Sequence, residues 1–160
     1  MAIIAEFDRS QADRVADLIL SIQRDEFGLP VSLQSQPDLL DIDAFYRVGA
    51  GDFWVALDGG DVVGTIALLD IGNGQAALRK MFVRASHRGT KHGVAQVLLM
   101  TLLGTARMRG ITEVWLGTTS RFLAAHRFYE KNGFKEVEQA ALPARFPVMA
   151  VDSKFYRRQL

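Results

Sequence analysis

The stretch from Ala76 to Arg109 constrains the fold of this chain more than any other. It begins with an apolar, strand-like run that ends at Val83, passes through a polar loop containing Gly89 and Gly93, and continues as a helix. A strand, a glycine loop and a helix in this order are typical of a domain in which helices cover a sheet. The N-terminus of such a helix has free N–H groups and a partial positive charge, which favour an anionic ligand.

The hydrophobic pattern predicts further elements on both sides of this unit. We expect strands at residues 3–7, 53–57, 62–69, 76–83, 113–117, 134–138 and 148–156, and helices at 11–26, 39–46, 93–109 and 122–131. The turn sequences Asp58–Asp61 and Asn73–Gly74 predict antiparallel hairpins. A length of 160 residues suits one domain, 1–160, and the element order predicts an α/β fold with a mixed sheet and helices on both faces.

The composition excludes several functional classes. Cysteine is absent, which removes disulfides, cysteine-ligated metals and cysteine nucleophiles together. No apolar run approaches the roughly 20 residues that span a bilayer, and the first residues do not form a secretory signal. We therefore expect a cytoplasmic protein with no membrane partner.

The charges are divided unevenly along the chain. Residues 1–78 hold four arginines against thirteen acidic residues, and residues 79–160 hold fifteen basic against five acidic residues. No acidic residue lies between Asp70 and Glu113, so this basic stretch either favours an anionic ligand or is a solvated face. The acidic half either favours a cationic acceptor, such as a polyamine, an aminoglycoside or lysine, or is solvated surface. No nucleic-acid partner is expected, because the basic residues are not interleaved with aromatic ones.

The loop before the second predicted long helix has the chemistry of a diphosphate cradle. Its glycines let the backbone approach a ligand closely, and Arg88 and Lys91 add positive charge. The spacing matches neither a P-loop nor the dinucleotide-binding Gly-x-Gly-x-x-Gly turn. The alternative is a loop whose glycines serve only its turns.

A second pattern, Ala-x-x-Phe-Tyr-x-x-x-Gly-Phe, occupies Ala125, Phe128, Tyr129, Gly133 and Phe134. Together the two segments resemble the GCN5-related N-acetyltransferase (GNAT) superfamily, whose members move an acetyl group from acetyl-CoA to an amine. The strand order is similar to that family over nearly the whole chain, which implies a mixed, mostly antiparallel central sheet of about seven strands.

The glycine loop departs in part from the family pattern Arg/Gln-x-x-Gly-x-Gly/Ala. Gly93, Val94 and Ala95 match its end, but Thr90 stands at the Arg/Gln position and Arg88 lies earlier than usual. We interpret this as a loop with two additional residues. Phe122 is a second departure, at a position where many members carry asparagine.

The resemblance implies acetyl-CoA as co-substrate. No metal is expected, because the two histidines of the glycine loop are not spaced as a helical i, i+4 pair and no carboxylate lies near them in the sequence. The resemblance implies cofactor contacts from Met81, Phe82, Val83, Arg88, Gly89, Thr90, Lys91, His92, Gly93, Val94, Ala95, Ala125 and Phe128. It also implies that Tyr129 is the general acid that protonates the departing CoA thiolate. Because Phe122, Ala125 and Tyr129 share one helical face, packing is the alternative role for Tyr129.

The acceptor is expected to be a small-molecule or peptide amine that attacks directly, and its proton needs a base. Glu26 is the candidate at the acceptor site, with Asp25, Glu113 and His87 as further candidates. The alternative function is a non-catalytic CoA-binding regulatory module. A homodimer is an open alternative because many relatives pair, and the sequence leaves open the acceptor, the base and the length of the acyl group.

Overall fold

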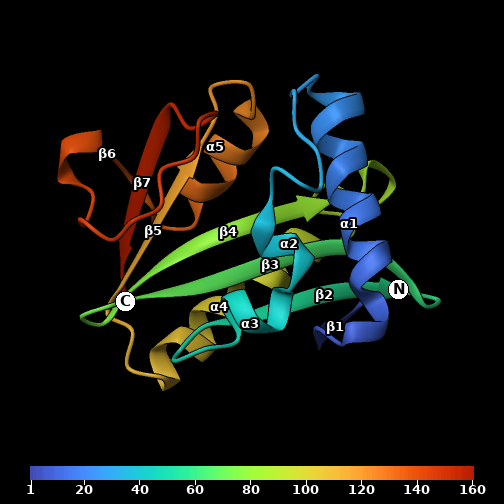
Figure 1. The fold of residues 1–160 in the computed structure, drawn as a ribbon, viewed down its shortest axis with the longest axis horizontal. Helices are drawn as coiled ribbons and strands as arrows, with labels where there is room; N and C mark the ends of the chain where they lie inside the picture. The colour runs from blue at the N-terminus through green and yellow to red at the C-terminus, as the bar shows by residue number, and fades with distance from the viewer.

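The computed structural model describes residues 1–160, and its centre is one seven-stranded sheet (Figure 1). The strands are β1 (Ile3–Glu6), β2 (Asp52–Asp58), β3 (Asp61–Gly72), β4 (Gln75–Val83), β5 (Glu113–Thr118), β6 (Lys135–Val137) and β7 (Lys154–Gln159). Their order in the sheet is β1-β2-β3-β4-β5-β7-β6, and every neighbouring pair is antiparallel except β4 and β5. The expected mixed, mostly antiparallel sheet is confirmed.

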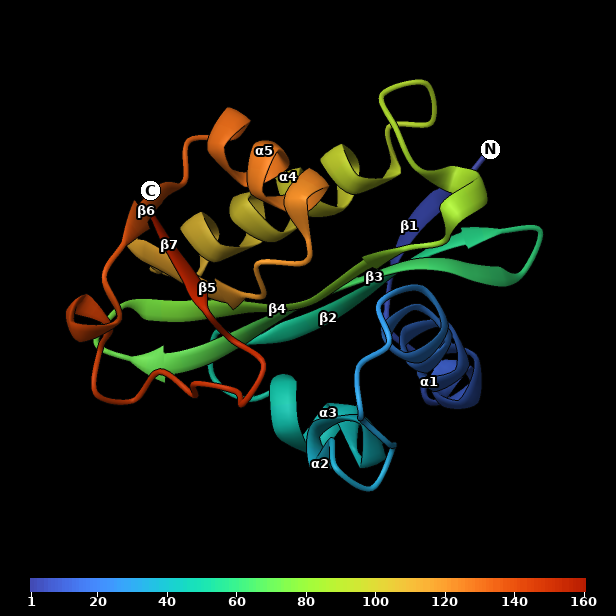
Figure 2. The ribbon, with the colours of Figure 1, turned by 90° about the horizontal axis from the view of Figure 1, so that it is seen from above.

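Helices cover both faces of the sheet, as expected (Figure 2). One face carries α1 (Ala12–Ser21), α2 (Pro37–Leu40) and α3 (Ile42–Tyr46), and the other carries α4 (Val94–Met108) and α5 (Leu123–Lys131). Strand β2 illustrates why both faces are covered. Phe53 and Val55 pack with the first group of helices, and Trp54 and Ala56 pack with the second. Side chains alternate across a strand, so a nearly continuous apolar strand needs cover on both sides.

The hairpin turns form as predicted. Asn73 and Gly74 both have positive φ, at 56° and 70°, between β3 and β4. Gly59 and Gly60 do the same between β2 and β3, at 58° and 87°. These left-handed conformations explain why glycine and asparagine occupy the turns.

Two expected helices have a different internal structure. The helix expected at 11–26 is α1 followed by a π-helical turn, Ile22–Glu26. The helix expected at 39–46 is divided at Asp41, whose backbone leaves the helical region and whose side chain accepts a hydrogen bond from the Ala44 N–H. Aspartate is a favourable N-cap residue, so a new helix, α3, begins after Asp41 and the preceding helix does not continue.

The last strand was predicted too early. Residues 148–156 were expected to form it, but β7 begins at Lys154. Met149 donates its N–H to the Asp152 carboxylate, and Asp152 donates its own N–H to the Met149 carbonyl. This turn uses backbone groups that a strand would need. The apolar residues Val148 and Val151 are consequently exposed.

Candidate active site

Strands β4 and β5 begin side by side and separate towards their ends (Figure 1). They pair only where residues 75–77 meet residues 113–115. Against β3, the register of β4 shifts so that Lys80 and Met81 together oppose Ile66, and Lys80 has a φ of 51°. Such a bulge bends the strand that carries it. Beyond Ala77, the edge of β4 that faces β5 has no partner strand, which leaves backbone groups for a ligand.

A pocket of about 520 Å³ lies between the end of β4, the following loop, the start of α4 and α5. The side chains and backbone of most predicted cofactor-binding residues line it: Met81, Phe82, Val83, Arg88, Gly89, Thr90, Gly93, Ala95, Ala125 and Phe128. Three of the predicted residues do not. Lys91 and His92 are exposed outside the pocket, and Val94 is buried in the core beneath α4.

The loop of this pocket has the geometry of an anion cradle. Gly89 and Gly93 have φ values of 95° and 66°, and no atom lies within 4 Å of where a Cβ would be. Gly93 is the residue before α4, and no side chain caps that helix. The first N–H groups of α4, at Val94, Ala95 and Gln96, have no acceptor within the helix. Free N–H groups, open space and the positive end of the helix dipole fit a phosphate group.

Arg88 connects the mouth of this pocket to the end of the first helix. Its Nε donates to the Val83 carbonyl at 2.7 Å, and its two terminal nitrogens donate to the two carboxylate oxygens of Glu26 at 2.6 and 2.9 Å. A bidentate pair of this kind fixes both side chains. Glu26 is therefore the partner of Arg88, and it lines neither of the pockets described here.

The other residues suggested as bases also lie elsewhere. Glu113 pairs with Arg157 at 3.0 Å, at the start of β5, and His87 contacts Asp58 at 2.7 Å. Asp25 is exposed on the π-helical turn. None of these three lines a pocket near Tyr129.

Tyr129 is buried, with 5% of its surface exposed, and it lines the larger pocket from α5. The chain has three tyrosines, and the hydroxyls of the other two, Tyr46 and Tyr156, donate to carboxylates at 2.6 and 2.7 Å. The Tyr129 hydroxyl has no hydrogen-bond partner in the protein. Burial raises the pKa of the Tyr129 phenol, so the group keeps its proton at neutral pH and remains a donor.

Tyr129 also lines a second pocket, of about 130 Å³. The two pockets share five lining residues: Met81, Phe82, Phe122, Ala125 and Tyr129. The phenol therefore stands where two ligands, one in each pocket, would meet.

Three charged residues of the smaller pocket were missed as site residues by the sequence analysis. Arg79 and Lys80 come from the bulged part of β4, and Asp152 comes from the turn before β7. Asp152 lies against β5 so closely that a Cβ on Gly117 would be 2.6 Å from its carboxylate oxygen. The only sequence signal was the pair of adjacent basic residues in a predicted strand. Nothing in the sequence indicated that Asp152 would reach them.

Comparison with known proteins identifies the family. The sequence model described as "Acetyltransferase (GNAT) family" matches residues 16–134. That range holds both motifs and most of the sheet, so the chain belongs to the Acetyltransferase (GNAT) family.

Individual relatives agree with this assignment. The chain is 38% identical over 106 residues to "N-acetyltransferase family 8 member 2" of Rattus norvegicus, which covers 63% of this chain and 46% of that protein. It is 38% identical over 104 residues to "N-acetylaspartate synthetase" of Xenopus tropicalis, which covers 62% of this chain and 37% of that protein. The chain thus matches less than half the length of these two curated relatives.

A solved structure matches over the full length. The crystal structure of an acetyltransferase of the GNAT family from Staphylococcus aureus MU50 superposes with a TM-score of 0.95 at 36% sequence identity, covering 99% of each chain. In the described fold, no group of three or more acidic or histidine side chains is arranged to hold a metal ion, and no helix has the length and apolar character to cross a membrane.

Proposed function

We propose that this protein is an acetyl-CoA-dependent N-acetyltransferase that transfers the acetyl group directly to a primary amine. The observation that carries this proposal is the meeting of two pockets at the unpaired hydroxyl of Tyr129. The larger pocket suits acetyl-CoA and the smaller one suits the amine. Family membership supports the choice of donor.

Acetyl-CoA is held in this proposal mainly by backbone. The diphosphate binds the free N–H groups at the start of α4 and the loop that begins at Arg88. The pantetheine arm lies along the unpaired edge of β4 at Met81, Phe82 and Val83. A β4 N–H in this region can also hold the thioester oxygen as negative charge develops on it.

Tyr129 acts as the general acid. The amine nitrogen forms a bond to the thioester carbonyl carbon, the carbon–sulfur bond breaks, and the sulfur leaves with the bonding electron pair. A thiol has a pKa near 8.5, below that of the buried phenol, so the resting thiolate is stabilised mainly by a hydrogen bond from the Tyr129 hydroxyl. A proton that passes from the phenol to the sulfur is replaced by the proton that the attacking nitrogen loses when it becomes the amide nitrogen. The absence of cysteine in the chain agrees with direct transfer.

Asp152 is the base in this proposal. Its carboxylate lines the smaller pocket, and burial raises the pKa of this carboxyl above the usual range of an aspartate. The Met149 N–H and the charges of Arg79 and Lys80 act in the opposite direction but are the lesser causes. A carboxylate with a raised pKa is a better proton acceptor for an ammonium group.

The test has two stages. Acetyl-CoA at about 100 times its Kd should stabilise the fold by about 2.7 kcal/mol, which raises the Tm of a domain this size by about 5–10 °C. Thiol release is then followed against a panel of primary amines. Stabilisation followed by thiol release supports the proposal. Stabilisation with no thiol release for any amine points to the non-catalytic CoA-binding module instead, and no stabilisation rejects both.

A further inference from the structure

Arg79 is a cation in the smaller pocket with no acidic partner. Its only side-chain hydrogen bond is to the thioether sulfur of Met149 at 3.3 Å, a weak acceptor, and it takes part in no ion pair. Its guanidinium stands over the rings of Phe45 and Tyr46, 5.5 and 5.9 Å from their centroids. These rings hold the arginine in place without neutralising its charge. Most of its N–H donors are therefore available to a ligand.

The bulge in β4 brings this cation into the pocket beside a second one. Adjacent strand residues normally face opposite sides of a sheet, but Arg79 and Lys80 both reach the α2–α3 side. The Lys80 ammonium is 3.5 Å from the Asp38 carboxylate and hydrogen-bonds the Gln36 side chain, and its side chain is 7% exposed. The positive charge of Lys80 is therefore paired with Asp38 within the protein. Arg79 is the cation of this pocket that is left for a ligand.

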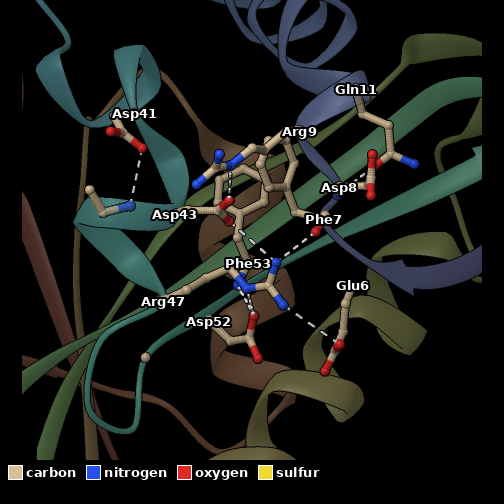
Figure 3. A network of polar contacts seen from close by, with 12 residues as sticks. Glu6, Phe7, Asp8, Arg9, Gln11, Asp41, Asp43, Arg47, Asp52 and Phe53 are labelled. Carbon is tan, nitrogen blue, oxygen red and sulfur yellow. Dashed lines mark hydrogen bonds and ion pairs between the residues drawn. The ribbon is translucent and has the colours of Figure 1, made fainter.

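The acidic residues of the N-terminal half, 1–78, do not line the smaller pocket. Figure 3 shows how their carboxylates are used: Arg47 pairs with Asp43 and Asp52 at 3.2 Å each and with Glu6 at 3.7 Å, and Arg9 pairs with Asp43 at 2.8 Å. The carboxylates of Glu26, Asp38 and Asp58 are paired as well. The exposed carboxylates Asp13, Asp17, Asp25, Asp41 and Asp61 fit the solvated-surface alternative, and none of them lines the smaller pocket. Asp152 is the only acidic residue that lines the smaller pocket.

We propose that the amine acceptor carries a carboxylate close to its amino group, and that Arg79 binds this carboxylate while Asp152 receives the amine. The proposal rests on the proposed acetyl transfer and names its substrate class, amino acids and similar zwitterions. The pocket presents one free cation and one acid, which match the two charges of such a molecule. A guanidinium suits this task because its fork of donors matches the two oxygens of a carboxylate.

The experiment compares matched acceptors. Alanine, leucine, phenylalanine and lysine are each tested beside the corresponding α-amide and the decarboxylated amine, with thiol release as the measurement. We expect a carboxylate-bearing acceptor to have a kcat/KM at least about 10-fold above that of its two analogues. Arg79→Gln should raise KM for that acceptor by about 10- to 100-fold, because a hydrogen bond to a charged group is lost. It should change KM for the decarboxylated amine by no more than about 2-fold.

Two further variants guard against a merely structural effect. Arg79→Lys keeps the charge without the fork and should restore part of the loss. Arg145→Gln removes an exposed arginine that does not line the pocket and should leave both acceptors unaffected. The Tm shift with acetyl-CoA should be that of the wild type in all three variants.

The outcomes separate this inference from the function on which it rests. If decarboxylated amines or amides are preferred, or if Arg79→Gln affects all acceptors equally, the acceptor does not use Arg79 and the inference is wrong, while acetyl transfer stands. If acetyl-CoA stabilises the protein but no amine in the panel releases thiol, the proposed function fails and the inference fails with it.

Discussion

Replacing Tyr129 with phenylalanine separates the catalytic role of this residue from a packing role. The ring packs against Phe134 and Tyr156, with centroids 5.7 and 6.0 Å away, and phenylalanine keeps these contacts. The hydroxyl makes no hydrogen bond within the protein, and Tyr129 lines both pockets, so removal of the hydroxyl costs no hydrogen bond. We expect the free energy of unfolding to change by less than about 1 kcal/mol, or to rise. A lost general acid should lower kcat by about 10²- to 10⁴-fold.

Tyr156 offers a matched control in the same aromatic cluster. Its hydroxyl donates to Glu130 at 2.7 Å, and the residue lines neither pocket. Tyr156→Phe removes that bond to a carboxylate, which should cost about 1–2 kcal/mol of stability. It should leave kcat within about 2-fold of the wild type.

The two variants should therefore have opposite effects: Tyr129→Phe should lower kcat and keep stability, and Tyr156→Phe should lower stability and keep kcat. Urea denaturation measures the stability of each, and steady-state thiol release measures kcat and the KM for acetyl-CoA. Tyr129→Phe should lower kcat with little change in that KM. If it instead loses stability and keeps its kcat, Tyr129 is a packing residue and the assigned role is wrong.

Three further predictions follow from the geometry of the site. Gly93→Ala places a side chain at a φ of 66°, so it should lower the free energy of unfolding by about 1–2 kcal/mol and weaken acetyl-CoA binding. Gly104→Ala lies within α4 with free space around it and should raise the free energy of unfolding by about 0.5–1 kcal/mol. Equal effects of the two variants in urea denaturation would contradict this. The base must be deprotonated to act, and the pKa of Asp152, which faces Arg79 and Lys80, is raised. As the pH is lowered, kcat/KM should therefore begin to fall at a higher pH than it would with an ordinary aspartate as the base. Asp152→Asn should abolish this acid limb of the pH profile, and a variant that keeps the limb would show that another group is the base. Gly117→Ala should displace the Asp152 carboxylate and lower kcat about 10-fold or more with wild-type acetyl-CoA binding, and an unchanged kcat would show that this contact has no part in the reaction.

The sequence predicts best what lies within one continuous segment. The loop from Arg88 to Gly93 and the helix with Tyr129 are local motifs, and their glycines and aromatic residues indicate a tight loop and a packed helix without reference to the rest of the chain. Nearly continuous apolar runs also locate the central strands, because a strand that is covered on both faces is apolar on both. These features account for the sheet, the helix positions and the larger pocket.

The smaller pocket could not be predicted because distant parts of the chain form it. Arg79 and Asp152 are brought together by a bulge at Lys80 and by a turn that replaces the first part of an expected strand. The apolar residues of 148–151 fit a strand by their pattern alone. The competing hydrogen bond from the Met149 N–H to Asp152 becomes visible only in the structure. The placement of the Asp152 carboxylate in the same pocket as Arg79 depends on tertiary contacts.

The most direct test of the site is a crystal structure of the protein with acetyl-CoA. It should show the diphosphate on the N–H groups at the start of α4 and the thioester sulfur within hydrogen-bonding distance of the Tyr129 hydroxyl. A diphosphate bound away from this loop, or a sulfur that the phenol cannot reach, would contradict the account.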